Sequence, residues 1–377
     1  MEISNKITTP QTNFAAARKT EKKDSGIDID LLSALMPGDG VSLSQKKIDT
    51  DKPEKEWYFQ MSEPTIGNLL MAKGLKSESA PPVEVSIIHT NDEHDNKFNK
   101  IAGEAAVVKS REKFYGDENS FIVNTGDISY EGSNDEPGPQ FFGPMADAFN
   151  SMGLEIFVPG NHEFQHGGKY LEEDLLPKLD AQTLLGNVTY KESGKPLEHT
   201  KPYVVQEMNG VKVGFIGLTT PRQATSAHPD VGYDVNVQSL RSAASDLVKK
   251  AKADGADIVV ILSHESVGRV KELGSSVEGI DIIVAGHDHK TLNQPETVKN
   301  PDGRNTLVVE AASNCRYVGD MNLEIDPKSK EIIGVNYKLF STGGVQPDPE
   351  VSAIVEKYKK IGRATRLNSS HVALSRM

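Results

Sequence analysis

The sequence has a single cysteine, Cys315, among its 377 residues. One thiol cannot form an internal disulfide, and it cannot build a thiolate zinc site, which needs several cysteines. Any metal ion must therefore be held by nitrogen and oxygen ligands.

Long apolar runs are missing as well. No stretch approaches the run of about 20 apolar residues that spans a bilayer. Residues 1–23 also lack the apolar centre of a secretory signal. The sequence as written therefore predicts a cytoplasmic chain with no membrane partner.

Basic residues are in the minority, with 42 Lys and Arg against 54 Asp and Glu and a formal net charge of −12. A surface that coats a nucleic-acid polymer needs basic patches to neutralise phosphates, so no such partner is predicted. Small phosphate compounds remain compatible, because bound metal ions can reverse the local potential.

The two ends of the chain differ from its middle. Residues 1–80 are polar and predict a mostly disordered leader, with a short helix near 64–73. A linker-type segment over 346–362 contains an amphipathic helix at 349–361. Residues 363–377 fit no predicted element and are interpreted as a non-native or disordered tail.

Residues 81–345 alternate between apolar runs and helical spacing, which indicates a layered α/β domain. Strands are expected over 83–88, 121–124, 155–158, 257–262 and 280–284. Helices are expected over 103–114, with Phe114 on its inward face, and over 141–152, 169–180, 237–253 and 268–273. Asn209-Gly210 predicts a hairpin of 201–208 with 211–218. Antiparallel strands over 308–311, 320–325 and 332–339 are expected to close the domain.

Five of the apolar runs end in side chains able to bind a metal ion. These are Asp92 and His94, then Asp127, then Asn161 and His162, then His264, and finally His287 and His289. In open α/β sheets, ligands bind at the carboxyl ends of the strands. The pattern therefore predicts one metal site assembled from five loops.

The types of side chain restrict the metal. Imidazole, carboxylate and amide groups suit manganese, iron, zinc or cobalt better than calcium or magnesium. Residues i and i+2 of an extended chain point the same way, so Asp92 and His94 can bind one ion together. The ligands exceed the need of one ion and favour two ions about 3.5–4 Å apart, with Asp127 placed to bridge them.

Five strings carry a resemblance to a known family: HTNDEH (89–94), NTGD (124–127), PGNHEF (159–164), LSHES (262–266) and AGHDH (285–289). They resemble the signature blocks of the calcineurin-like metallophosphoesterases, in particular the 5′-nucleotidase and UDP-sugar hydrolase branch. The match covers about residues 83–345. The resemblance implies an α/β fold, a four-layer αββα sandwich with mixed sheets flanked by helices, and a catalytic domain over 81–345.

The resemblance also implies a dinuclear hydrolase of small phosphate esters. One divalent ion would be held by Asp92, His94, Asp127 and His289, and the second by Asp127, Asn161, His264 and His287. A metal-bridging hydroxide would attack phosphorus in line. His162 would stabilise the transition state or protonate the leaving oxygen.

Two positions depart from the family pattern. Gln165 stands where the family usually has an Asp that orients the histidine, and a neutral amide stabilises an imidazolium less. We therefore expect weaker activity toward poor leaving groups. Asp95 stands where a glycine is common, which is expected to reshape the loop near the first ion.

In the 5′-nucleotidase branch, a helix like 349–361 leads to a second domain that clamps the nucleotide. The resemblance therefore implies either a truncated two-domain enzyme or a stand-alone catalytic domain. It also implies a family whose members are often periplasmic or extracellular. A broad-specificity phosphodiesterase or nuclease on the same core, or a catalytically weak metal-binding domain, are the alternatives. His89 is expected to pack rather than to bind metal.

Overall fold

The computed structural model describes residues 80–95, 98–128, 142–221 and 234–374, with side chains up to residue 361. It also describes two short strands nearer the N-terminus, β1 (Leu43–Gln45) and β2 (Phe59–Met61), which pair antiparallel. The chain divides into two compact units, Met1–Pro81 and Pro82–Met377. The helix expected near 64–73 lies outside the described residues.

The second unit contains a seven-stranded sheet in the order β17-β16-β3-β4-β5-β6-β8. Its strands in chain order are β3 (Val83–Thr90), β4 (Ser120–Asn124), β5 (Ile156–Phe157), β6 (Gln182–Leu184), β8 (Thr200–Lys201), β16 (Tyr317–Ile325) and β17 (Ile332–Ser341). Strands β3, β4, β5, β6 and β8 run parallel to one another. Strand β16 pairs antiparallel with β3, and β17 pairs antiparallel with β16.

A six-stranded sheet has the order β14-β15-β13-β12-β10-β9. Its strands are β9 (Tyr203–Met208), β10 (Val211–Thr219), β12 (Ile258–His264), β13 (Ile282–Ala285), β14 (Glu296–Lys299) and β15 (Asn305–Val309). The four central strands run parallel, and the edge strands β9 and β14 are antiparallel to their neighbours. A separate pair is formed by β7 (Val188–Tyr190) and β11 (Val235–Val237).

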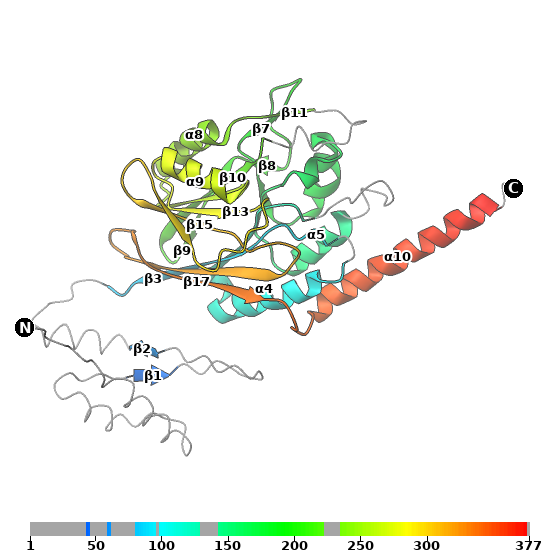
Figure 1. Cartoon of the computed structure of the whole chain (residues 1–377), viewed down its shortest axis with the longest axis horizontal. Coiled ribbons are helices and arrows are strands. Elements are labelled where there is room, and N and C mark those ends of the chain that lie inside the picture. The colour runs from blue at the N-terminus through cyan, green and yellow to red at the C-terminus, as the bar shows by residue number, and fades with distance from the viewer. Residues whose placement is uncertain are drawn as a thin grey trace, which may run out of the picture. The chain divides into compact units, whose positions relative to one another are not determined.

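Helices cover the outer faces of the two sheets (Figure 1). On the seven-stranded side lie α4 (Ile101–Tyr115), α5 (Phe142–Ser151) and the start of α10 (Pro349–Leu374). On the six-stranded side lie α8 (Leu240–Ala253) and α9 (Val267–Ser276). In the part of the chain that the structure describes, no helix is both long enough and apolar enough to cross a membrane.

Alternation along the strands sorts apolar side chains into separate layers. On β3, Ile88 packs in the core with α4 and α5, whereas Ile87 packs in the core between the two sheets. On β12, Val260 faces that same central core and Ile261 packs with α8 and α9. Three apolar cores therefore separate four layers, which confirms the expected α/β sandwich with mixed sheets flanked by helices.

Several predictions about individual elements need correction. The strand expected over 308–311 is β15, which lies in the six-stranded sheet, parallel to β13. The helix expected over 169–180 is broken into α6 (Gly168–Tyr170), a π-helical turn (Leu171–Leu175) and a 3₁₀ turn (Leu176–Lys178). Phe114 is 40 % exposed, so it does not face the core.

The C-terminal helix is longer than expected. Helix α10 continues to Leu374, so the interpretation of residues 363–374 as fitting no element is wrong. Extending an existing helix adds one hydrogen bond per residue fixed and needs no new nucleus, so a polar sequence without proline can continue it.

Candidate metal centre

The carboxyl ends of strands from both sheets meet at one place. The loop after β3 runs beside the loop after β4, because Asp92 N donates to Gly126 O at 2.9 Å and His94 N donates to Asp127 O at 3.2 Å. The loop after β13 joins them, because His287 N donates to Asp92 Oδ2 at 2.8 Å. The structure therefore assembles the predicted exit loops into one cluster.

One group of possible ligands consists of Asp92, His94 and His289, whose ligand atoms all lie within 4.8 Å of one another. The Nε2 atoms of His94 and His289 lie 3.1 Å apart. Asp92 Oδ1 lies 3.8 Å from His94 Nε2 and 3.4 Å from His289 Nε2. These atoms converge on one point, as the ligands of a single ion would.

A second group consists of Asp127, His264 and His287. Asp127 Oδ2 lies 3.1 Å from His264 Nε2, which lies 3.3 Å from His287 Nδ1. Asn161 Oδ1 joins them at 2.8 Å from His287 Nδ1 and 3.1 Å from His264 Nε2. The seven side chains expected to bind metal therefore lie together, with Asp127 Oδ2 also 3.8 Å from His94 Nε2 in the first group.

The second group fits a cation. His264 Nδ1 lies 2.7 Å from the carbonyl oxygen of Thr125, which can only accept, so this nitrogen carries a proton. In the neutral ring His264 Nε2 is then a lone pair, and it faces the oxygens of Asp127 and Asn161. Electron pairs that converge in this way need a proton or a metal ion between them.

The backbone at the cluster is unusual. Five of the seven expected ligands have φ in the left-handed region, where residues other than glycine are uncommon: Asp92 (53°), His94 (45°), Asp127 (55°), His287 (81°) and His289 (58°). Such conformations persist only where the surroundings hold them, and they gather at functional sites.

The loops approach one another closely because two residues lack side chains. A Cβ at Gly160 would lie 2.2 Å from Asp127 Oδ1 and 2.7 Å from His264 Cε1. A Cβ at Gly126 would lie 2.3 Å from the backbone nitrogen of Gly160. Glycine at both positions therefore allows the ligand loops of β4 and β5 to pack against each other.

The buried charges of the cluster perturb one another. Burial alone would raise the pKa of Asp127, but the imidazoles of His264, His162 and His94 outweigh it and hold the pKa below its usual range. Burial opposes a charge on His264, yet the carboxylate of Asp127 raises the pKa of that imidazole to about 10. Without metal, a proton therefore occupies the place between these two residues.

The other imidazoles respond to their surroundings in different directions. Burial lowers the pKa of His94 to about 4 and also lowers the pKa of His287, which the neighbouring His264 lowers further. The contact with Asp92 raises the pKa of His289. His94 and His287 therefore offer neutral nitrogens, as metal binding requires.

His162, the expected catalytic residue, lies beside the candidate bridge. Its backbone nitrogen donates to Asp127 Oδ1 at 2.8 Å, and its Nε2 lies 3.8 Å from Asp127 Oδ2. His162 also forms a third possible metal group with His94 and Asp127. Gln165 follows one turn later, with its backbone nitrogen donating to His162 O at 3.2 Å.

Two other polar residues take structural roles. Asp95 accepts hydrogen bonds from the backbone nitrogens of Asn99, Lys100 and Ile101 at 2.8–3.2 Å, so it caps the start of α4. His89 is fully buried on β3, where burial lowers its pKa to about 3. Its Nε2 lies 3.3 Å from Tyr337 Oη, so it packs within the sheet and does not join the cluster.

Sequence reasoning missed the buried acids behind the ligands. Glu163 accepts from three backbone nitrogens, Glu93 Oε1 accepts from Asn124 Nδ2 at 2.7 Å, and Glu310 Oε1 accepts from Lys290 N at 2.8 Å. All three side chains are fully buried. Glu163 and Glu93 stand inside the quoted motifs, so their position next to a ligand was an available signal.

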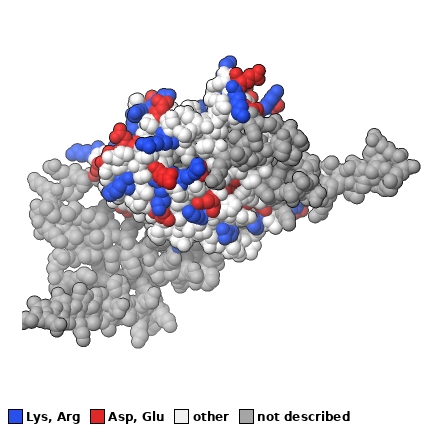
Figure 2. Space-filling model, turned by 45° about the horizontal axis from the view of Figure 1, so that its top comes forward, with Lys and Arg blue, Asp and Glu red and all other residues white. Residues whose placement is uncertain are grey.

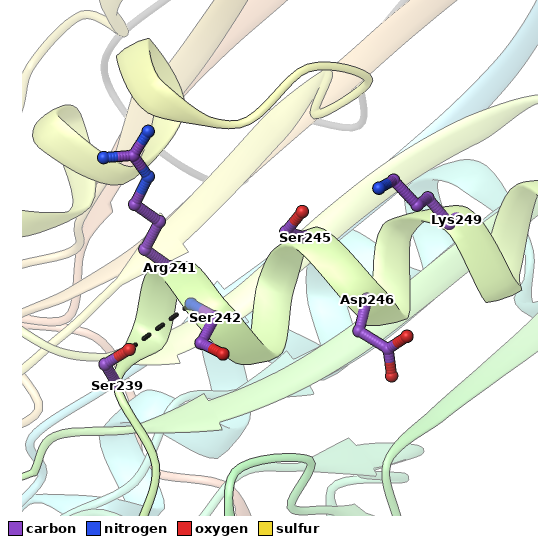
Figure 3. Close-up of a pocket in the computed structure, with 6 residues that line it drawn as sticks. All are labelled: Ser239, Arg241, Ser242, Ser245, Asp246 and Lys249. Carbon is purple, nitrogen blue, oxygen red and sulfur yellow. Dashed lines mark hydrogen bonds between the residues drawn. The ribbon is translucent and has the colours of Figure 1, made fainter.

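A hollow of about 430 Å³ lies elsewhere, along the exposed side of α8 (Figure 3). It is lined by Ser239, Arg241, Ser242, Ser245, Asp246 and Lys249. All six residues come from this helix or its N-cap, and none belongs to a strand exit. The hollow is therefore separate from the metal-binding cluster.

Two packed sheets with imidazole and carboxylate groups at their joined strand ends are typical of a metal-dependent hydrolase. The calcineurin-like phosphoesterase family matches residues 85–291, more than half of the chain, and the chain belongs to this family.

Relatives extend the comparison. The chain is 26 % identical over 313 residues to a 5′-nucleotidase of Diplobatis ommata, an alignment that covers 74 % of this chain and 52 % of the relative. It is 26 % identical over 298 residues to a probable 5′-nucleotidase of Treponema pallidum, covering 69 % and 48 %. The chain therefore spans about half the length of these relatives.

A solved structure shares the fold. The 5′-nucleotidase precursor of Thermus thermophilus superimposes with a TM-score of 0.64 at 24 % identity, covering 74 % of this chain and 59 % of that one. At this identity the likeness establishes the sandwich architecture and leaves the substrate to be argued from the site.

Proposed function

We propose that this chain is a dinuclear-metal phosphoesterase that hydrolyses small phosphate esters, with nucleotides or nucleotide sugars as the substrate class that its relatives suggest. The observation that carries the proposal is the pair of converging ligand groups that meet at Asp127. One ion is assigned to Asp92, His94, Asp127 and His289, and the other to Asp127, Asn161, His264 and His287.

The bound ions would supply Lewis-acid stabilisation of the phosphoryl oxygens and lower the pKa of a water molecule. Their identity remains open among manganese, zinc, iron and cobalt, since all four accept nitrogen and oxygen ligands. The chain's own contribution is to hold the ligands in place before substrate arrives. Fixed loops of this kind favour the transition state because little reorganisation is needed during the reaction.

Differences in exposure indicate the direction from which substrate approaches. The side chains of Asp92 and His264 are fully buried, whereas His162 is 18 % exposed and His289 is 44 % exposed. The leaving group would therefore lie toward His162 and His289. His162 is placed to hold a proton at Nε2 for the leaving oxygen, and Gln165 is proposed to orient its ring.

The surface supports a small substrate over a polymer. On the face shown in Figure 2, acidic and basic side chains are interspersed and form no continuous basic patch. The net charge of −12 points the same way. A long polyanion would find little to neutralise its phosphates on such a surface.

Phosphate release by metal-stripped protein that is resupplied with Mn²⁺ tests the proposal. We expect Mn²⁺-dependent hydrolysis of the monoester p-nitrophenyl phosphate, and a parallel assay with AMP measures how well the base is recognised. Cleavage of the diester bis(p-nitrophenyl) phosphate releases p-nitrophenol and no inorganic phosphate, so it is followed by p-nitrophenol absorbance, and a preference for this compound would favour a phosphodiesterase. Absence of hydrolysis of all three by protein that holds two ions would contradict an enzymatic role and favour a metal-binding domain.

A further inference from the structure

One buried side chain ties the loops of the cluster together although it has no place among the ligands. Glu163 is fully buried on the 3₁₀ turn His162–Phe164. Its Oε2 accepts hydrogen bonds from Gly160 N at 2.7 Å and Asp127 N at 2.8 Å, and its Oε1 accepts from Ile128 N at 3.0 Å. The three donors come from two separate loops, one after β4 and one after β5.

These contacts continue to the candidate ligands. Asp127 Oδ1 accepts from the backbone nitrogen of His162, next in the chain to Glu163, at 2.8 Å. This contact occupies one carboxylate oxygen of Asp127 and turns the other toward His264 Nε2, 3.1 Å away. A closed ring of hydrogen bonds therefore sets both the backbone and the side chain of Asp127.

The three hydrogen bonds that Glu163 accepts from Gly160, Asp127 and Ile128, which form the Glu163 clamp, also explain how the strained backbone persists. Asp127 has φ of 55°, and the Gly126 and Gly160 turns approach too closely for either residue to carry a side chain. A side chain that accepts three hydrogen bonds from the backbone of two loops can hold such a conformation in place.

We infer that Glu163 is a positioning residue of the metal centre, which holds Asp127 and the Asn161–His162 turn in the arrangement that binds both ions. The inference rests on the proposed function for its kinetic consequence only. Residues behind the ligands of a metal centre commonly change metal affinity or activity by about 10–100-fold when replaced.

Glu163→Gln tests the inference at nearly constant shape. The amide group that replaces one carboxylate oxygen is a donor and would face a backbone N–H, so at least one of the three hydrogen bonds is lost. Glu155→Gln is the matched control. Glu155 directly precedes β5, and its Oε1 accepts from Ile122 N in the middle of β4 at 3.1 Å, away from the loops that carry the ligands.

Three measurements on the full chain separate positioning from general stability. For Glu163→Gln we expect Mn²⁺ affinity by calorimetry to fall about 10–100-fold. Amide hydrogen exchange at residues 126–128 should quicken in metal-free protein. At saturating Mn²⁺, kcat for p-nitrophenyl phosphate should fall about 10-fold or more, with KM changed by less than about threefold. Glu155→Gln should leave all three close to wild type.

Unchanged Mn²⁺ affinity and unchanged exchange in Glu163→Gln would overturn the inference, as would equal losses in Glu155→Gln. If wild-type protein binds Mn²⁺ but has no turnover, the proposed function fails while affinity and exchange still decide the role of Glu163. If Glu163→Gln does not fold, wild-type exchange decides. Slow exchange of the Asp127 and Ile128 amides in metal-free protein supports the clamp, and exchange as fast as in an open loop contradicts it.

Discussion

The two sheets contribute different chemistry to the cluster. The loops of the seven-stranded sheet provide both carboxylates, Asp92 and Asp127, and the amide of Asn161, together with one imidazole. The six-stranded sheet provides imidazoles alone, from His264 at the end of β12 and from His287 and His289 in the loop after β13. The negative charge of the candidate ligands therefore comes entirely from one sheet, and most of the imidazole nitrogens come from the other.

Hydrogen bonds between the two sheets hold their ligand-bearing ends next to each other. His264 Nδ1 donates to the Thr125 carbonyl at 2.7 Å, and Thr125 Oγ1 donates to the Ala285 carbonyl at 3.0 Å. With the contact from His287 N to Asp92 Oδ2 at 2.8 Å, these bonds join the two ligand edges without any metal. The seven-stranded sheet therefore supplies the negative charge of the cluster, and hydrogen bonds to the six-stranded sheet fix where the ligands of both sheets lie.

Asp127→Asn should have the largest effect, because it removes a charge that both proposed ion sites share. We expect loss of both ions and of turnover together, by about a thousandfold or more, since bound ions supply several kcal/mol of charge stabilisation. Metal content by mass spectrometry and hydrolysis of p-nitrophenyl phosphate measure the two effects. A variant that binds both ions and retains the wild-type rate would contradict the claim that the carboxylates of the seven-stranded sheet supply the charge that binds metal.

His264→Gln and His289→Gln compare two imidazoles of the six-stranded sheet. His264 is buried at the proposed second ion site, so its replacement should remove that ion and lower kcat about 100-fold, a cost of about 3 kcal/mol. His289 is 44 % exposed, so water can replace it and the loss should be smaller. Metal stoichiometry and kcat for both variants check the order. A larger loss for His289→Gln than for His264→Gln would contradict the claim that the buried imidazole matters more for metal binding than the exposed one.

Much of this arrangement could be predicted from the sequence because it follows from strict local patterns. Apolar runs of three to five residues located central strands such as β4 and β12, and Asn209-Gly210 located the antiparallel hairpin of β9 and β10. The polar groups at the strand exits pointed to the cluster because parallel strands end at a common edge.

Other features depend on tertiary contacts that a single sequence does not reveal. β14 and the separate β7–β11 pair escaped prediction because short edge strands lack a continuous apolar run. Glu104 was not recognised as buried because an acid on a helix normally faces water, yet it is 1 % exposed. The backbone contacts of Glu163 likewise arise only when two distant loops meet.

Glu104→Gln should have the smallest effect of these substitutions, and it tests the buried acids that lie against the seven-stranded sheet. Burial, together with the charge of Asp95, raises the pKa of Glu104 to about 8, above the ordinary value of 4.5. The folded state then binds a proton more tightly than the unfolded state, so this group's stabilising contribution is complete below about pH 4.5 and is lost as pH rises to about 8.

Glu104→Gln cannot ionise. Its melting temperature relative to wild type, measured without metal by circular dichroism, should therefore rise between pH 5 and pH 8, by about 2–4 °C for each kcal/mol. If the difference between the two proteins stays constant over this range, Glu104 is not the buried acid that makes this half of the molecule sensitive to pH.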